Sequence, residues 1–221
     1  MKIEVLTVNY NTPELVKQLF LTISKHCSYE LNYTVINNGP IKFVDASSII
    51  NVLDFINEAK RYIDECKRNT KLHLRPSKSV FGSVHHAYTI DEYIYNKSNA
   101  DYILLFDTDV IINKNFDKQI KFLIDSNQPL FSCLTPEDIS GNRFLRVAPH
   151  CCFINRKLFI NLGLKFLTLD KFLDITHTYA YDTGRGLLEN ISKMNLKFFK
   201  DNSFFQHLKG ISWKKVEGKL K

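Results

Sequence analysis

One stretch of the sequence decides the fold: Ile103-Leu104-Leu105-Phe106-Asp107-Thr108-Asp109-Val110-Ile111-Ile112. Its apolar beginning predicts a strand over 101–106 that is buried on both faces, as in a parallel sheet covered by helices. Two carboxylates, Asp107 and Asp109, then stand between two apolar runs. Because burying like charges without a partner is costly, this placement requires a compensating cation.

Carboxylate oxygens are the ligands that Mg²⁺ and Mn²⁺ prefer, and these ions commonly share their shell with substrate phosphates. We therefore predict that Asp107 and Asp109 bind one of them, with both side chains on the same side of an extended segment. The competing interpretation is that the two residues are turn formers and N-caps before a helix near Phe116.

Outward from this stretch, strand patterns alternate with helix patterns, which is typical of βαβ units and a mostly parallel sheet. We predict a single α/β domain over 1–221, with a nucleotide-binding half at 1–112 and an acceptor-binding half at 113–221. The predicted strands are 3–8, 34–36, 72–74, 101–106, 129–134, 151–154 and 196–199, and the predicted helices are one that starts after Thr12, 49–66, 84–95, 116–124 and 184–194.

In open α/β sheets, ligands bind beyond the carboxyl ends of the strands. That rule selects three loops, at 9–12, 37–40 and 107–109. In the first loop, Thr12 has the residue type of a helix N-cap, and Pro13 follows at the favoured first helical position.

Composition limits the classes of function. A content of 44% hydrophobic and 24% charged residues is typical of a globular chain, and the net charge of +7 favours anionic partners. No helix-turn-helix or RNA-recognition motif is present, so we expect no nucleic-acid partner. None of the five cysteines forms a Cys-x-x-Cys pair, and we expect Cys151 and Cys152 to be reduced thiols in a buried strand.

The sequence shows no signal peptide and no apolar run long enough for a transmembrane helix, so we expect a cytoplasmic protein. Its basic C-terminal tail could make peripheral contact with an anionic membrane surface. The lysines of that tail are Lys209, Lys214, Lys215, Lys219 and Lys221.

Several motifs together resemble the GT-A-fold glycosyltransferases, especially the family 2-like inverting enzymes. Asp107-Thr108-Asp109 resembles their Asp-x-Asp motif, and 5–11 resembles their first strand and nucleotide loop. The segment 35–39 resembles their second strand, Tyr181-Asp182-Thr183-Gly184 their later acidic segment, and 207–213 their C-terminal segment. The order of these motifs extends the resemblance over nearly the whole chain.

The resemblance implies a metal-dependent transfer of one sugar from a nucleotide-diphosphate sugar to a glycan or lipid-linked acceptor, with inversion by direct displacement. Asp109 would bind Mn²⁺ or Mg²⁺ directly, Asp107 through water or by holding the ribose, and His207 as a third ligand. Asp182 would be the general base, with Asp170 and Asp174 as reserves. The donor nucleotide, for which UDP is favoured, would lie against Val8, Asn9, Tyr10, Asn38, Asp107 and Thr108.

The sequence departs from the family in two places. Asn38 stands where many members have an acid, and Phe81-Gly82-Ser83-Val84-His85-His86 replaces the usual Gly-rich helix start. Adjacent residues on a helix diverge by about 100°, so His85 and His86 cannot easily share a metal. We expect one of them to face the donor and the other to pack.

Three alternatives stay open. The first is a haloacid-dehalogenase-type phosphatase or phosphotransferase, in which Asp107 would be the nucleophile. The second is a sugar nucleotidyltransferase, although the loop at 9–13 lacks the glycines that cradle a triphosphate. The third is a non-catalytic module that binds nucleotide or sugar.

Overall fold

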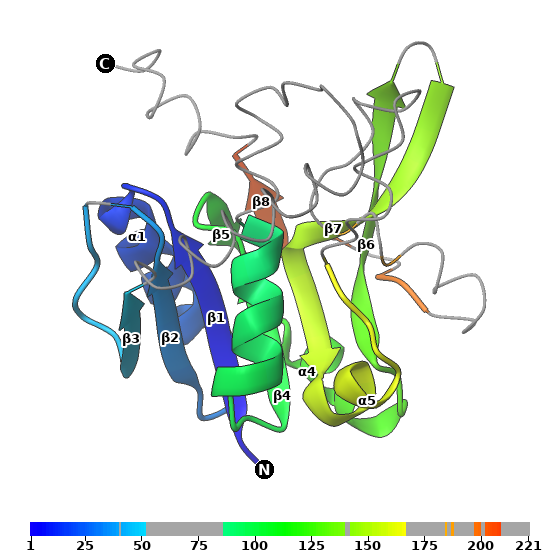
Figure 1. The fold of residues 1–221 in the computed structure, drawn as a ribbon, viewed down its shortest axis with the longest axis horizontal. Helices are drawn as coiled ribbons and strands as arrows, with labels where there is room; N and C mark the ends of the chain where they lie inside the picture. Colours follow the sequence, from blue (N-terminus) through cyan, green and yellow to red (C-terminus); the bar gives the residue numbers. More distant parts are fainter. Residues whose placement is uncertain are drawn as a thin grey trace, which may run out of the picture.

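The fold is organised around a mixed sheet in which the described strands lie in the order β3-β2-β1-β4-β7-β6 (Figure 1). The computed structural model describes residues 1–39, 41–51, 86–139, 142–166, 184, 187, 197–199 and 202–208. Neighbouring strands from β3 to β4 pair in parallel, whereas β7 is antiparallel to both β4 and β6. The predicted α/β class with a mostly parallel sheet is confirmed.

The described elements form one main sheet, one separate pair of strands and the helices around them. The strands of the main sheet are β1 (Ile3–Asn9), β2 (Asn32–Asn37), β3 (Ser48–Asn51), β4 (Tyr102–Phe106), β6 (Leu130–Ile139) and β7 (Asn142–Asn155). A separate pair is formed by β5 (Val110–Ile112) and β8 (Phe205–His207). The helices are α1 (Pro13–His26), 86–92 running into the π-helix η1 (Tyr93–Lys97), α4 (Asp117–Asp125) and α5 (Arg156–Asn161).

Both faces of the sheet are buried under helices. Along β4, Ile103 and Leu105 pack into one core, which the helix at 86–92, η1 and α5 cover. Leu104 and Phe106 pack into a second core, which α1 and α4 cover. Successive side chains of a strand point to opposite faces, so an uninterrupted apolar run is what a twice-covered strand requires. This packing directs the strand ends, where polar residues begin, toward one edge of the sheet.

Two local expectations are wrong. The predicted helix at 49–66 is contradicted at its start, because Ile49 belongs to β3 and pairs with Val35 of β2; 52–66 lies outside the described residues. The segment at 107–109 is a turn and not extended, since the backbone N–H of Val110 donates to the carbonyl of Asp107 (3.2 Å). A β-branched pair such as Ile49-Ile50 gains more from an edge of the sheet than from a helix.

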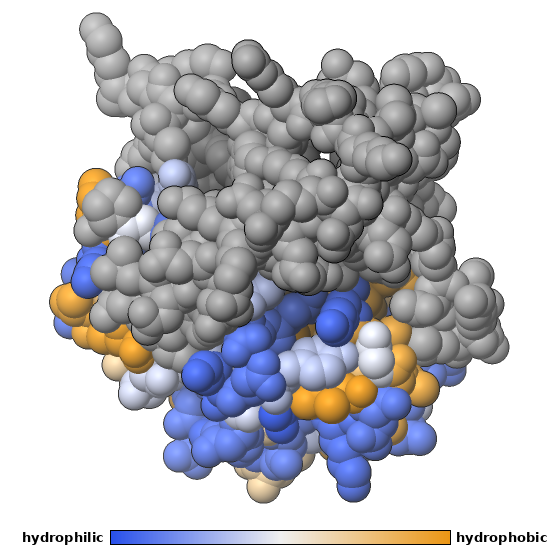
Figure 2. Space-filling view, viewed as in Figure 1, coloured by the Kyte–Doolittle hydropathy of each residue, from blue (hydrophilic) through white to orange (hydrophobic). Residues whose placement is uncertain are grey.

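On the face that Figure 2 shows, the described surface is mainly hydrophilic, with several separate hydrophobic patches. Exposed hydrophobic side chains include Ile41 and Val44, between β2 and β3, and Ile49 in β3, which are 55%, 68% and 37% exposed. Among the residues that the structure describes, no helix combines the length and apolarity that crossing a bilayer requires. The lysines of the C-terminal tail lie outside the described residues.

Candidate functional site

Three side chains converge at the carboxyl end of β4. They are Asp107, Asp109 and His207, and one ligand atom from each lies within 4.8 Å of the others. We call this group the acidic corner. Asp109 is almost fully buried, with 3% of its side chain exposed, and its Oδ1 lies 3.2 Å from Nε2 of His207. Two carboxylates so close together repel each other unless a positive charge lies between or beside them.

The backbone explains how residues 98 positions apart in the sequence meet. The turn after β4 lets the chain enter β5, whose Val110 pairs with His207 of β8. The N–H of Leu208 donates to the carbonyl of Asp109 (2.9 Å). The short β5–β8 pair therefore brings the imidazole beside the carboxylate, and the turn at 107–110 directs both acids toward the same point.

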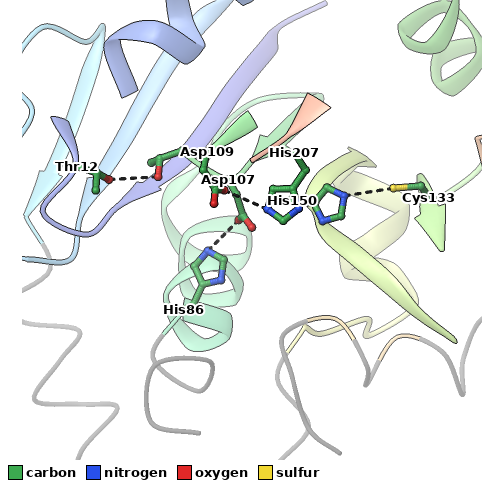
Figure 3. A network of polar contacts seen from close by, with 8 residues as sticks. Thr12, His86, Asp107, Asp109, Cys133, His150 and His207 are labelled. Carbon is green, nitrogen blue, oxygen red and sulfur yellow. Dashed lines mark hydrogen bonds and ion pairs between the residues drawn. The ribbon is translucent and has the colours of Figure 1, made fainter. Parts of the chain in front are cut away.

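A second histidine, His86, contacts Asp107 of the acidic corner. His86, in the first described turn of the helix at 86–92, lies with Nε2 3.6 Å from Oδ1 of Asp107 (Figure 3). His86 is 23% and Asp107 26% exposed at the side chain, so both groups are reachable from solvent. His86 thus faces the acidic corner, and His85 lies outside the described residues. Which of the two faces a donor stays a prediction.

The donor set fits a divalent cation. Two carboxylates and one imidazole suit Mn²⁺, which accepts both oxygen and nitrogen ligands, and also suit Mg²⁺ at the carboxylates. Asp109 is buried beside the imidazole of His207, and burying a carboxylate charge has a high desolvation cost that a bound cation would offset. Asp107 and Asp109 are the predicted ligands from the Asp-x-Asp motif, and the structure brings them together with His207 as expected.

A second group of polar residues lies at the ends of β1 and β2. Asn9 and Asn37 are register partners there, and Nδ2 of Asn9 donates to Oδ1 of Asn37 (2.8 Å) and to the carbonyl of Ile41 (2.9 Å). The amide of Asn37 in turn exchanges two hydrogen bonds with the backbone of Phe43, each 2.9 Å. Together with Asn11 and Gly39, these residues form what we call the asparagine corner.

Asn11 and Gly39 complete the asparagine corner by a close approach. Asn11 has a left-handed backbone, with φ +61°, and its Oδ1 accepts the N–H of Ile41 (2.9 Å). A Cβ on Gly39 would overlap that same oxygen, so the position requires glycine for space. The loops after β1 and β2 are therefore tied to each other by side-chain amides.

One contact joins the two corners. The hydroxyls of Thr12 and Thr108 lie 3.3 Å apart, and both residues are buried (Figure 3). Thr12 occupies the N-cap position of α1 as predicted, with Pro13 next, but its hydroxyl makes no capping hydrogen bond. Instead the N–H of Thr12 donates to Oδ1 of Asn9 (2.9 Å). The loop after β1 is thereby attached to the Asp-x-Asp turn.

The remaining residues predicted to bind the nucleotide lie along this same edge. Val8 is buried and packs into the core, so its side chain is unavailable to a ligand. Tyr10 is 42% exposed at the loop between the corners. Asn38 is buried, and its N–H donates to the carbonyl of Asn9 (2.8 Å). Which of these residues contact a nucleotide stays a prediction.

The predicted base Asp182 lies outside the described residues, as do Asp170 and Asp174. Gly184, which closes the same motif, is described: it has φ +90°, and a Cβ there would lie 2.6 Å from the carbonyl oxygen of Val147 in β7. The motif therefore ends against the strand that carries His150, three residues further along.

Sequence reasoning gave no place in the metal site to His150. Its ring stacks in parallel on the ring of His207, with centroids 4.2 Å apart and planes 8° apart. Its Nε2 lies 3.8 Å from Sγ of Cys133 (Figure 3). The available signal was strand register, because His150 precedes the predicted strand that pairs with β4.

The adjacent cysteines are buried thiols, as predicted. Cys151 and Cys152 are completely buried in β7, and burial raises the pKa of both thiols well above the ordinary value. Burial also raises the pKa of the Cys133 thiol from 9.0 to about 11. These groups are protonated at neutral pH and are poor nucleophiles in that state.

Comparison with known proteins supplies the fold family. No family model matches the chain, and no curated protein matches it in sequence. Among solved structures, it resembles the glycosyltransferase GlyE of Streptococcus pneumoniae TIGR4, with a TM-score of 0.52 and 11% identity over 91% of this chain and 46% of GlyE. It also resembles mouse xyloside xylosyltransferase 1, with a TM-score of 0.52 and 8% identity over 90% of this chain and 84% of the mouse chain.

The chain has the GT-A fold of glycosyltransferases. Identities this low establish the fold alone, and the chain spans less than half of GlyE. Within the GT-A fold, the acidic corner lies at the carboxyl end of the central strand, where α/β proteins bind their ligands.

Proposed function

We propose that the chain is a metal-dependent glycosyltransferase that moves one sugar from a nucleotide-diphosphate sugar, UDP favoured, to a glycan or lipid-linked acceptor. The observation that carries this proposal is the acidic corner, in which Asp107, Asp109 and His207 lie within 4.8 Å at the ligand edge of a GT-A fold. Solvent-accessible Asp107 beside almost fully buried Asp109 leaves one side of the cluster open to a ligand.

The residues divide the work as follows. Asp109 and His207, with Asp107, would hold Mn²⁺ or Mg²⁺, and the ion would supply Lewis-acid stabilisation of the negative charge on the leaving diphosphate. Tyr10 and Asn38 contact the nucleoside from the loops after β1 and β2. The half at 1–112 thus binds the nucleotide, and the half at 113–221 binds the acceptor and contributes His207 to the metal.

The acceptor hydroxyl must lose a proton as it attacks the anomeric carbon. Asp182 accepts this proton as the general base, and attack on the face opposite the diphosphate inverts the anomeric configuration. The closure of its motif against β7 at Gly184 supports this assignment, because β7 also carries the backbone that contacts Asp107.

The first experiment measures thermal unfolding with UDP, GDP, CDP, ADP and dTDP, each with and without Mn²⁺. A nucleotide at about 100 times its Kd stabilises the folded state by about 2.7 kcal/mol, which raises the melting temperature of a chain this long by roughly 5–10 °C. We expect one nucleotide to give this shift with the ion only. The absence of any ion-dependent shift would contradict the proposal.

The second experiment asks about turnover. Release of nucleotide diphosphate from the matching nucleotide sugar, with water as acceptor, is measured for the wild type and for Asp182→Asn. Loss of a general base lowers the rate by about 10²–10⁴ and leaves the Mn²⁺-dependent shift intact. Asn115→Ala, in the exposed turn before α4, is the control. Binding without turnover in the wild type would favour the non-catalytic module, and synthesis of nucleotide sugar from a triphosphate would favour the nucleotidyltransferase.

A further inference from the structure

His150 contacts the acidic corner twice, through two different parts of the residue. The first contact follows from strand register. Phe106 of β4 pairs with Cys151 of β7, so His150 stands opposite the first residue after β4. The N–H of Asp107 accordingly donates to the carbonyl of His150 (3.2 Å). The backbone of His150 thus fixes the point at which the Asp-x-Asp turn leaves the sheet.

The second contact is made by the side chain. The imidazoles of His150 and His207 lie parallel, with centroids 4.2 Å apart and an angle of 8° between planes. His207 ends a strand of only three residues, and 29% of its side chain is exposed. A short exposed strand restrains its side chains weakly, so a flat partner on one face of the His207 ring limits the orientations that the ring can take.

The ring of His150 is itself held in place. His150 is only 8% exposed, and its Nε2 lies 3.8 Å from Sγ of Cys133, a buried residue of β6. The register of β6 and β7 shifts between Ser132 and Leu134, at the position of Cys133. The ring of Phe205 adds a tilted contact, with centroids 5.6 Å apart. The imidazole of His150 is therefore held in place between the main sheet and the β5–β8 pair.

We propose that His150 is a positioning residue of the metal site, which orients the imidazole of His207 by stacking and the turn of Asp107 through its carbonyl. The inference rests on the proposed function in one respect, that His207 and the two acids bind a divalent ion. Residues that orient metal ligands from outside the coordination shell commonly change metal affinity by 10- to 100-fold when they are replaced. Parallel stacking adds no ligand atom, so the side chain of His150 acts on affinity only through His207, while its carbonyl, which His150→Ala leaves in place, holds the turn of Asp107.

The test is a double-mutant cycle on Mn²⁺ affinity, measured by the electron paramagnetic resonance of free Mn²⁺ and without any turnover. We expect His150→Ala to weaken binding about tenfold. His150→Phe, which keeps a flat ring, should stay within about threefold of the wild type. In a His207→Ala background, His150→Ala should have no further effect, because the group on which it acts is gone.

A second measurement uses the metal-free protein. The ring protons of His207, observed by NMR after histidine labelling, should be shifted upfield by the ring current of His150, and this shift should vanish in His150→Ala and persist in His150→Phe. Cys133→Ala keeps both rings and removes only the anchor, so it covers the case in which His150→Ala does not fold. We expect Cys133→Ala to weaken Mn²⁺ binding by about two- to threefold, a smaller effect than removal of the stacked ring.

The outcomes separate the inference from the function. Wild-type Mn²⁺ affinity in His150→Ala, or the same loss in the His207→Ala background, would overturn the role of His150 and leave the metal site intact. Failure of the wild type to bind Mn²⁺ would overturn the metal dependence of the proposed function and this inference with it. Absence of the upfield shift in the wild type would overturn the stacking on which the role depends.

Discussion

The asparagine corner and the acidic corner lie at the same edge of one sheet, yet they are stabilised differently. In the asparagine corner, neutral amides exchange hydrogen bonds with nearby backbone, as when Asn37 contacts Phe43 six residues later. In the acidic corner, two carboxylates meet an imidazole from nearly a hundred residues further along the chain, and the two acids repel each other. The amides of the asparagine corner have hydrogen-bond partners within the chain. The acidic corner is the one that a bound cation would stabilise most. We therefore interpret the asparagine corner as a scaffold for the ligand site and the acidic corner as the groups that act on the ligand.

The largest expected effect comes from Asp109→Asn in the acidic corner. The amide keeps the volume and removes the charge that holds the ion, so release of nucleotide diphosphate should fall by about 10²–10³ and the Mn²⁺-dependent thermal shift should vanish. The metal-free protein should melt at nearly the wild-type temperature, because repulsion with Asp107 is also relieved. Asp125→Asn, at an exposed pair with Lys121, is the control. Normal turnover in Asp109→Asn would show that the acidic corner is not the metal site.

Two adjacent asparagines test the scaffold role directly. Asn37→Ala removes the partners of the N–H and carbonyl of Phe43 and one of the two acceptors of Nδ2 of Asn9, at about 1–3 kcal/mol for each group left unsatisfied. We expect the melting temperature to fall by about 6–12 °C if the total is about 3 kcal/mol. Asn38→Ala should melt near the wild type, since the hydrogen bond described for Asn38 comes from its backbone.

For nucleotide binding, we expect the opposite order of effects from these two variants. Asn38→Ala should weaken nucleotide binding in a titration, whereas residual binding by folded Asn37→Ala should be closer to normal. If Asn37→Ala and Asn38→Ala have equal effects on stability and on binding, the distinction between scaffold and ligand contact fails at this corner.

A smaller effect is expected from Gly39→Ala. The added methyl group displaces the side chain of Asn11 and breaks its hydrogen bond with Ile41, which costs about 1 kcal/mol. In the double variant with Asn11→Gly, the loss from Gly39→Ala should largely disappear relative to Asn11→Gly alone, because both changes remove the same hydrogen bond and glycine at 11 removes the obstruction and adopts φ +61° without strain. Chemical denaturation of the four proteins measures the coupling energy. Additive losses would mean that Asn11 and Gly39 do not contact each other as described.

A further effect, absent at neutral pH, concerns the pH dependence of stability at Cys133, which anchors His150. Burial raises the folded-state pKa of the Cys133 thiol from 9.0 to about 11. A group with a raised pKa contributes stability that is complete below pH 9 and is lost as the pH rises toward 11. Between pH 8 and pH 10 this loss amounts to about 1 kcal/mol, and Cys133→Ala should lack that part of the slope in denaturant titrations. An identical slope in both proteins would contradict burial of an ionisable thiol there.

Much of the fold was predictable because it depends on local patterns. The apolar run at 101–106 indicated a twice-covered strand, and the helix predicted at 116–124 agrees with α4 to within one residue. Thr12 and Pro13 marked the start of α1 correctly. The helix predicted from Ile49 failed because periodicity alone does not distinguish a short apolar strand from the start of a helix, and pairing with β2 decided between them.

The sequence predicted the two acids of the candidate site more directly than its histidines. Asp107 and Asp109 were evident from charge placed between apolar runs, a local signal. His207 was predicted only through the family resemblance. Its position beside Asp109 depends on the pairing of β5 with β8. His150 had no local signal at all, since its contacts follow from the register between β4 and β7.

The sequence by itself determined the central strand and its parallel neighbours β1 and β2, where the charged turn follows the central strand, and that the adjacent cysteines at 151 and 152 are buried. Only the tertiary structure decided that the amides of Asn9 and Asn37 bind each other and that three histidines gather around two acids. The physical reason is range: propensity and periodicity act over a few residues, whereas ring stacking and ion pairing depend on strand registers that the whole core selects.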